Sequence, residues 1–429
     1  MCIFIVHKYY RDKMSDDKDM KHIVETMFDI TGLDKNQMNI LLSNPTCPPP
    51  DPSSNVPQSS KIIINLVNDL VDTGGDHQFK TDNPFNGMQK CGYFMPNKGQ
   101  PSTSSKPKTL LATQDVKPFR LLSGNSINNL VGTNLSAHYK MNRKNNLIKN
   151  YQKARDMKIM HFYRWIVDHR YFQTAQTKPD FICSDGRLRD ILLTPISREA
   201  WTFNAIRIHD MIFLWDAKPT KRGGDIGSYS ALRFQQMATG HSNPEVVKEH
   251  EKVHSVGLIP FQYGSRPSHQ LLMYTDANEG SMGDNVIVRM KSLNSREKSD
   301  KFRKYWGDIV VLSASKFVLG LADVNSGDHI LAKTEFLNEA QLWTRSRVGE
   351  PMKSSRHLCY DFVDQVLVWM KLQLPKNDQT VVKKFSYSKS KSGIQDGKFT
   401  IECNTERIGE KKLNTLLPRW FLDGALGIK

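Results

Sequence analysis

Residues 201–217 read WTFNAIRI-HD-MIFLWDA, in which two apolar runs, Trp201–Ile208 and Met211–Ala217, flank the polar pair His209-Asp210. Both runs are rich in β-branched and aromatic residues. Two such runs separated by only two turn residues indicate a β-hairpin. The stretch therefore predicts an antiparallel strand pair near the middle of the chain, and the rest of the fold has to be built around it.

On either side of this hairpin the chain alternates between strand-like and helix-like patterns. Tyr151–His169 places apolar residues at helical spacing, and Ser354–Leu374 does so until Pro375 ends the pattern. Because hairpins outnumber helix-linked parallel strand pairs, the pattern predicts an α+β fold with mixed or antiparallel β-sheets flanked by helices. Further strands are predicted at Gln270–Ala277, Asn285–Lys291, Lys316–Ala322, His329–Glu335, Val381–Tyr387 and Lys398–Cys403.

The first part of the chain has a different composition. Thr46–Ser60 and Gly99–Lys108 are rich in proline and serine, which is typical of linkers. Between them, Lys61–Val71 is a short apolar element that fits a helix or a strand. We therefore expect residues 1–114 to be a partly disordered N-terminal extension and residues 115–429 to be a single large domain.

The overall charge points to a polyanionic partner. Lysine and arginine outnumber aspartate and glutamate by 60 to 44, a net charge of +16, and nucleic acid is the commonest partner of such proteins. The six cysteines are scattered without a zinc-binding or disulfide spacing. No apolar run has the length of a signal-peptide core or a membrane span, so we expect a soluble, intracellular protein.

Several segments resemble, in the same order, the DXO family of decapping nucleases, which remove incomplete or non-canonical caps from RNA 5′ ends. The resemblance runs from about residue 115 to residue 425. It implies a nuclease-like domain, an RNA 5′ end as partner, Mg²⁺ or Mn²⁺ as cofactor if the site is active, and a nuclear rather than cytoplasmic location. Some members resemble partners of 5′→3′ exoribonucleases. The matching segments are His161–Arg170, Phe181–Gly186, Ile191–Pro195, Trp201–Pro219, Leu271–Asn278, Val286–Ser292, Trp306–Gly327, the Ser354 helix and Leu417–Phe421.

The chain departs from the family at the residues that the resemblance makes catalytic. Where the family has acids, the resemblance places Gln235, Asn278 and Arg289, and it leaves Asp276 and Lys291 as catalytic remnants. The weak candidates for metal ligands are Asp276 and the Met290 backbone carbonyl. Asp185 precedes Gly186 where the family has an arginine, and the family's helical glutamine falls at Ile309. Candidate substrate-binding residues are Asp185, Gly186, Arg289, Lys291, Arg296, Lys301 and Arg303.

Electrostatics decides what these departures mean. A guanidinium about 4 Å from a divalent ion is repelled by roughly 8 kcal/mol at an effective dielectric constant of about 20. Mg²⁺ also needs oxygen ligands that the chain has lost. Arg289 and Lys291, two residues apart on a strand, share one face and could hold a phosphate directly. The sequence thus predicts an RNA 5′-end-binding protein with reduced or lost metal-dependent hydrolysis.

Three alternatives stay open. Asp276 with Glu279 or Asp284 could rebuild a one-metal site, giving an active decapping nuclease or 5′→3′ exoribonuclease that removes NAD-type or incomplete caps. The chain could instead be a scaffold partner of an exoribonuclease. Arg289 and Lys291 could also be no more than a solvated strand face.

Overall fold

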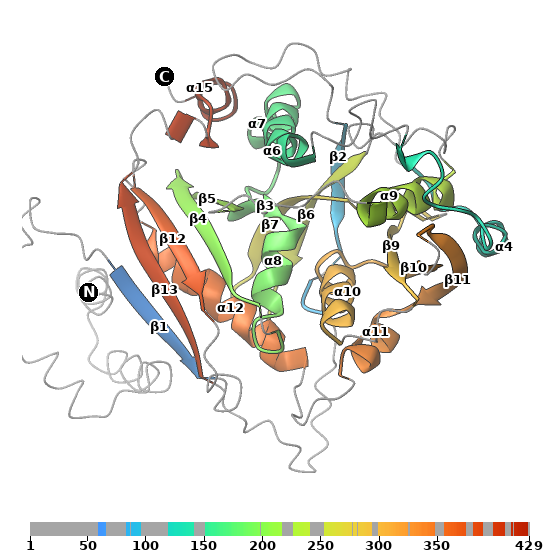
Figure 1. Cartoon of the computed structure of the whole chain (residues 1–429). Coiled ribbons are helices and arrows are strands. Elements are labelled where there is room, and N and C mark those ends of the chain that lie inside the picture. The colour runs from blue at the N-terminus through green and yellow to red at the C-terminus, as the bar shows by residue number, and fades with distance from the viewer. Residues whose placement is uncertain are drawn as a thin grey trace, which may run out of the picture. The chain divides into compact units, whose positions relative to one another are not determined.

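The computed structural model describes most of the chain from Ser59 onward, and the described residues all belong to one compact unit, Gln58–Lys429 (Figure 1). Met20–Leu42, where the sequence is compatible with one or two helices, lies outside the described residues. The described ranges are 59–65, 83–85, 87–95, 119–140, 151–197, 199–216, 226–240, 253–276, 278–280, 282–293, 299–324, 327–347, 356–374, 381–388, 398–407, 413–414 and 416–427.

The larger sheet is built around the predicted hairpin. Within the described residues it has 9 strands in the order β1-β13-β12-β4-β5-β3-β7-β6-β2. β4 and β5 pair antiparallel, with Ile208 opposite Met211, so the hairpin prediction is confirmed. β3 pairs parallel with both β5 and β7, which makes the sheet mixed, as the sequence predicts. The strands are β1 (Ser59–Asn65), β2 (Gln89–Phe94), β3 (Phe181–Ser184), β4 (Trp201–Ile208), β5 (Met211–Asp216), β6 (His254–Phe261), β7 (His269–Thr275), β12 (Val381–Tyr387) and β13 (Lys398–Arg407).

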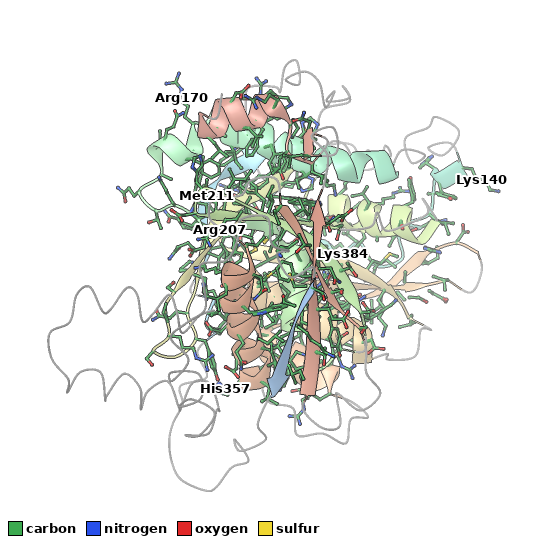
Figure 2. The ribbon with its side chains drawn as sticks, turned by 90° about the vertical axis from the view of Figure 1, so that its left-hand side faces the viewer. Lys140, Arg170, Arg207, Met211, His357 and Lys384 are labelled. Atoms are coloured by element: carbon green, nitrogen blue, oxygen red, sulfur yellow. The ribbon has the colours of Figure 1, made fainter. Side chains whose placement is uncertain are left out.

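Helices cover both faces of this sheet because each face is lined by apolar side chains. α8 (Asp185–Leu192) and α12 (Arg356–Gln373) pack on one face, where Leu188 and Phe362 join the largest hydrophobic cluster. α6 (Tyr151–Asp168) packs on the other face, together with the C-terminal helix α15 (Arg419–Phe421), whose Phe421 stacks on Tyr163 at 4.3 Å. Figure 2 shows α12 running alongside β1 and β13.

A second, smaller sheet follows the first along the chain. In the described residues its order is β11-β10-β9-β8, and β9 pairs parallel with β10. α9 covers one face, where Phe234 meets Val286 and Val288, and α10 covers the other, where Ile287 joins the main cluster. The new elements are β8 (Asn278–Glu279), β9 (Asn285–Ser292), β10 (Lys316–Asp323), β11 (Ile330–Leu337), α9 (Ile226–Ala238) and α10 (Ser299–Val311).

The two sheets meet through the helices α8 and α10, which lie side by side between them (Figure 1). A glycine makes the close approach of these helices possible. A Cβ atom at Gly307 of α10 would lie 2.7 Å from Arg189 Cγ and 3.2 Å from Leu193 of the α8 end. Contacts that short do not occur in folded proteins without a shift of one partner. The bare backbone at Gly307 therefore sets how the neighbouring Asp308 faces α8.

Both edges of the larger sheet come from the part of the chain before residue 115. β1 pairs with β13 over seven residues, from Ser59 opposite Asn404 to Asn65 opposite Lys398. β2 pairs with β6 at the opposite edge. The expected boundary at residue 115 therefore needs correction, because strands on its N-terminal side complete the sheet. Proline-rich and serine-rich flanks hid them, although Lys61–Val71 does contain a strand, one of the two expected options.

Short elements complete the described fold. They are α4 (Gly124–Asn128), α7 (Tyr171–Thr174), α11 (Glu339–Ser346) and the π-helical turn η4 (Leu422–Leu426). Among the described residues, no helix combines the length and the apolar character that crossing a bilayer would require.

Candidate functional site

The candidate site lies where α8 and α10 meet β9. Along β9, Val286 and Val288 pack under α9, so the alternate residues, Arg289 and Lys291, face α10. The prediction that Arg289 and Lys291 share a face is therefore confirmed. Their surroundings differ, since Lys291 is buried with its ammonium 5.0 Å from the Phe302 ring centre, whereas the Arg289 side chain keeps 26% of its surface exposed.

A buried aspartate joins two guanidinium groups. Asp308 of α10, whose side chain is 5% exposed, places Oδ1 2.7 Å from Arg189 Nη1 and Oδ2 3.5 Å from Arg289 Nη2. Arg289 Nη1 also donates to the Val288 carbonyl at 3.2 Å. The Arg189 contact is a short, charge-assisted hydrogen bond, while the Arg289 contact is at the limit of one. Arg289 is therefore the more loosely held of the two arginines.

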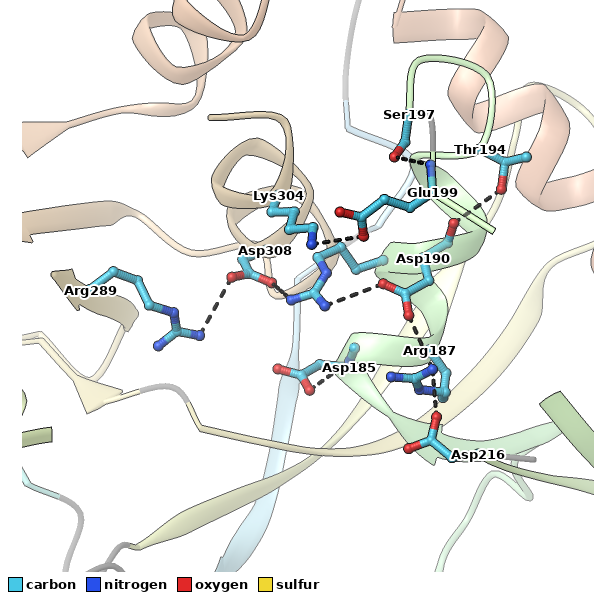
Figure 3. A network of polar contacts seen from close by, with 12 residues as sticks. Asp185, Arg187, Asp190, Thr194, Ser197, Glu199, Asp216, Arg289, Lys304 and Asp308 are labelled. Carbon is cyan, nitrogen blue, oxygen red and sulfur yellow. Dashed lines mark hydrogen bonds and ion pairs between the residues drawn. The ribbon is translucent and has the colours of Figure 1, made fainter. Parts of the chain in front are cut away.

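The ion pairs continue from Arg189 along α8 to β5. Arg189 Nη2 lies 3.2 Å from Asp190 Oδ1, and Arg187 Nη1 lies 3.1 Å from Asp190 Oδ2 and 2.6 Å from Asp216 Oδ1. Figure 3 shows this alternating series from Arg289 to Asp216. Burial lowers the pKa of the Arg189 guanidinium, but the negative charges of Asp308 and Asp190 outweigh burial and raise this pKa above its ordinary value. Each arginine in the series therefore contacts at least one aspartate.

Asp185 begins α8 and faces the same region. Its Oδ1 accepts from the Gly186 N–H at 2.7 Å, and its Oδ2 accepts from Thr275 Oγ1 at 2.9 Å. Burial, followed by the negative charges of Asp276 and Asp308, raises the pKa of the Asp185 carboxyl to about 6, although Arg189 opposes the shift. Asp185 therefore changes charge close to neutral pH, unlike an ordinary surface aspartate.

Asp276 follows β7 and lies beside a histidine and a lysine. His254 Nδ1 lies 2.8 Å from Asp276 Oδ1, and Lys158 Nζ lies 4.0 Å from the same oxygen. His254 is fully buried against Phe94, whose ring is stacked on it at 5.1 Å. The predicted catalytic remnant thus contacts His254 of β6 and lies near Lys158 of α6.

The two amides expected at lost acid positions come together on the other face of the small sheet. Gln235 Nε2 of α9 donates to Asn278 Oδ1 of β8 at 3.3 Å, and each residue is only 8% exposed. Asn278 lies opposite Val286, on the face that α9 covers, whereas Arg289 lies on the face that α10 covers. The fold therefore brings Gln235 and Asn278 into contact, and β9 separates this pair from Arg189 and Arg289.

The remaining predicted residues are more dispersed. Arg303 is buried, with Nη1 2.7 Å from Asp300 and Nε donating to the Ser346 carbonyl, so it stabilises α10 rather than facing a ligand. Lys301 is exposed on the same helix, and Arg296 lies outside the described residues. Met290 sits opposite Gly320 within the paired part of β9. Ile309 is buried in the main core, and its neighbour Asp308 takes the position that faces the site.

The residues present do not fit a divalent metal site. The two acids proposed to assist Asp276 are engaged elsewhere: Glu279 with Lys90 at 3.3 Å and Arg120 at 3.4 Å, and Asp284 with the Ser315 hydroxyl. In the part of the chain that the structure describes, no three histidine, cysteine, aspartate or glutamate side chains are placed to share a metal ion. On one face of β9 the amide pair is neutral, and on the other face Arg289 is a cation, whereas divalent metal ions bind carboxylates.

Sequence reasoning missed the residues that organise this site. Arg189 and Asp308 are 119 positions apart, and neither belongs to a local motif. Asp308 could have been identified from the predicted position at Ile309, which is the next residue. A shift of one residue along a helix moves the side chain by about 100° around the axis, so a small error in register selects the wrong residue. For Arg189, an arginine on a short helix otherwise lined by Leu188, Ile191 and Leu192 was the available hint.

Part of the chain matches a family model. Residues 102–256 match the family model described as RAI1 like PD-(D/E)XK nuclease. No curated protein sequence matches the chain.

Solved structures match a larger part of it. The chain is similar to S. pombe Rai1, with a TM-score of 0.55 and 13% identity over 81% of this chain and 100% of that chain. It is similar to Scheffersomyces stipitis Rai1 in complex with (3′-NADP)+ and calcium ion, with a TM-score of 0.55 and 13% identity over 87% and 100%. It is also similar to Candida albicans Rai1 in complex with pU5-Mn2+, with a TM-score of 0.54 and 12% identity over 80% and 96%. Identities this low establish the fold and leave the chemistry of the site to its own residues.

Proposed function

We propose that this protein, of which residues 102–256 match the RAI1 like PD-(D/E)XK nuclease model, binds the 5′ end of RNA without metal-dependent hydrolysis. The relatives whose structures contain pU5 or a dinucleotide show that this fold can hold such ligands. The net charge of +16 favours association with a polyanion, whatever its sequence.

The observation that supports the loss of metal-dependent hydrolysis is the contact between Gln235 and Asn278. A pair of carboxylates at these positions would repel each other unless a cation lay between them. The two amides instead form a hydrogen bond of 3.3 Å that needs no cation. Since neither amide carries a charge, the pair supports a site that is stable without metal and contributes little to holding one.

The phosphate contact is assigned to Arg289. Its guanidinium is partly exposed, it is positioned by the Val288 carbonyl and Asp308, and it has further N–H groups that can donate to phosphate oxygens. Arginine suits this task because its planar group binds two oxygens of one phosphate at once. Lys301 is exposed on α10, the helix that faces Arg289, and adds a positive charge to that helix.

The proposal is tested by titrating a 5′-monophosphate RNA oligomer into the protein with Mg²⁺, with Mn²⁺ and with chelator, following binding and cleavage in the same samples. We expect metal-independent binding without cleavage. Arg289→Gln should weaken binding about tenfold and lower the salt-dependence slope by about one, as loss of one phosphate contact does. Asp210→Asn, which changes an exposed acid between β4 and β5, serves as the control.

Two results would contradict the proposal. Cleavage that requires Mg²⁺ or Mn²⁺ and is lost in Asp276→Ala would restore the alternative of an active decapping nuclease. Neither binding nor cleavage, with a folded protein, would favour the scaffold alternative.

A further inference from the structure

We propose that Arg189 and Arg289 together form a phosphate site for a terminal 5′-phosphate, and that Asp308 occupies this site in the ligand-free protein. The inference rests on the proposed function and names its ligand class. It extends the site to Arg189, and it gives Asp308 the role of an internal competitor of the phosphate.

The geometry of Asp308 supports this role. Its two carboxylate oxygens each face a different guanidinium, Oδ1 toward Arg189 at 2.7 Å and Oδ2 toward Arg289 at 3.5 Å. A phosphate presents pairs of oxygens in a similar arrangement, and two arginines bridged by one anion are a common way to bind it. Asp308 is 5% exposed, whereas the side chains of Arg189 and Arg289 are 20% and 26% exposed. A ligand from solvent therefore reaches the arginines before it reaches the carboxylate.

The charges explain why the acid matters. With Asp308 and Asp190 ionised, the two positive charges of Arg189 and Arg289 are balanced by the two acids that contact them. Asp185 faces the same place with a further carboxyl group. The net charge of the ligand-free site is therefore close to zero, and an anion of low charge binds there only weakly. A doubly charged terminal phosphate competes for the guanidiniums far better than a singly charged internal phosphodiester does.

Arg289 is the arginine that the ligand can capture first. Its contact with Asp308 is the longest in the series, and its other protein contact is to a neutral carbonyl. Arg189 is held tightly by Asp308 and also contacts Asp190, so it stays in place when Asp308 exchanges one partner for the ligand. The arrangement predicts that phosphate specificity comes from the balance between one acid and two arginines.

The test compares two RNA oligomers of the same sequence, one with a 5′-phosphate and one with a 5′-hydroxyl, binding to the full chain. In Asp308→Asn, removal of the competing charge should tighten binding of the 5′-phosphate RNA about tenfold and leave the 5′-hydroxyl RNA unchanged. Asp308→Glu keeps the charge and should not tighten binding. Asp300→Asn, on the same helix but paired with Arg303, is the matched control.

The outcomes separate this inference from the proposed function. Wild-type protein that does not prefer the 5′-phosphate RNA contradicts the proposed function itself. A wild-type preference combined with unchanged or weaker binding by Asp308→Asn overturns the inference alone. Equal tightening for both RNAs shows a general charge effect and overturns the inference as well.

If Asp308→Asn does not fold, the variant Arg189→Lys tests the inference instead. It keeps the charge but loses the bidentate contact, so it should weaken the 5′-phosphate preference as much as Arg289→Lys, and no effect of Arg189→Lys would overturn the two-arginine site.

Discussion

At the scale of single residues, the candidate site is controlled by carboxyl groups held close to one another and to arginines. Asp185 is the clearest case, because burial and the charges of Asp276 and Asp308 raise its pKa to about 6. A carboxyl whose pKa is raised on folding binds its proton more tightly in the folded protein. Its ionisation therefore opposes folding, and it also opposes the arrival of another anion.

The first prediction concerns pH. Between about pH 4 and pH 6 the folded protein holds the Asp185 proton and the unfolded chain has lost it, so this residue should make stability fall as pH rises through that window. We expect Asp185→Asn to flatten this part of the profile and to raise the melting temperature more at pH 7.5 than at pH 4.5, as measured by thermal melts. Asp210→Asn, an exposed acid, should leave the profile unchanged. A wild-type profile identical to that of Asp185→Asn would contradict the assignment.

A second residue-scale prediction concerns the amide pair. Changing Gln235→Glu and Asn278→Asp together places two carboxylates in a buried contact that now joins two amides at 3.3 Å. We expect the double variant to lose roughly 3 kcal/mol of unfolding free energy in chelator, because buried charges without partners are strongly destabilising. Mn²⁺ should restore part of this loss in the double variant and do nothing in the wild type. Each single variant is the control, and a double variant as stable as the wild type in chelator would refute the account.

At the scale of secondary-structure elements, the site depends on how closely α8 and α10 pack. Gly307 permits this packing, since a Cβ atom there would lie 2.7 Å from Arg189 Cγ. The same helix pair carries the contact between Asp308 and Arg189. One small residue therefore couples the stability of the helix interface to the geometry of the charges.

The corresponding prediction is that Gly307→Ala will destabilise the protein by about 2 kcal/mol, although alanine favours helices, because overpacking outweighs propensity. It should also weaken the preference for 5′-phosphate RNA, because the added Cβ would push Arg189 out of the place where it acts with Arg289. Chemical denaturation and RNA titration measure the two effects. Gly124→Ala is the control, because an added Cβ there would meet its nearest neighbour at an ordinary 3.7 Å. A stabilised Gly307→Ala would show that the helices are not tightly packed at this point.

At the scale of the whole molecule, the described unit depends on two strands, β1 and β2, that come from its N-terminal part. β1 covers the β13 edge, buries Ile64 and bonds to α12 through Ser60 Oγ and Gln373 Oε1 at 2.6 Å. β2 covers the other edge and brings Lys90 and Tyr93 to Glu279, next to Asn278. Uncovered edges tend to pair with other chains, so both strands protect the sheet.

Truncation tests this arrangement. Removing residues 1–57 should leave the melting temperature of the protein unchanged, since the described unit begins at Gln58. Removing residues 1–65 should lower the unfolding free energy by roughly 3 kcal/mol, from the lost burial of Ile62 and Ile64, and should promote aggregation through the exposed β13 edge. Thermal melts and light scattering would measure both. Equal behaviour of the two truncated proteins would mean that β1 contributes nothing to the sheet.

Local patterns in the sequence determined the elements of this protein. The hairpin at Trp201–Asp216 and the helices at Tyr151–Asp168 and Arg356–Gln373 follow from residue type and spacing, because each is stabilised mainly by its own periodicity of apolar side chains. The shared face of Arg289 and Lys291 follows in the same way, since side chains two apart on a strand point in one direction. The resemblance of segments, in order, to the DXO family was sufficient to predict an α+β fold, which this chain shares with S. pombe Rai1.

Only the tertiary structure decided which charges meet. Asp308 and Arg189 are 119 positions apart, and their contact exists because α8 and α10 pack closely at Gly307. The burial of Lys291 and Arg303, and the separation of the Gln235–Asn278 pair from Arg289 by β9, depend equally on which elements cover each face of the small sheet. Spacing along a chain fixes where a side chain points on its own element. The partner that it meets depends on the packing of elements that no local pattern records.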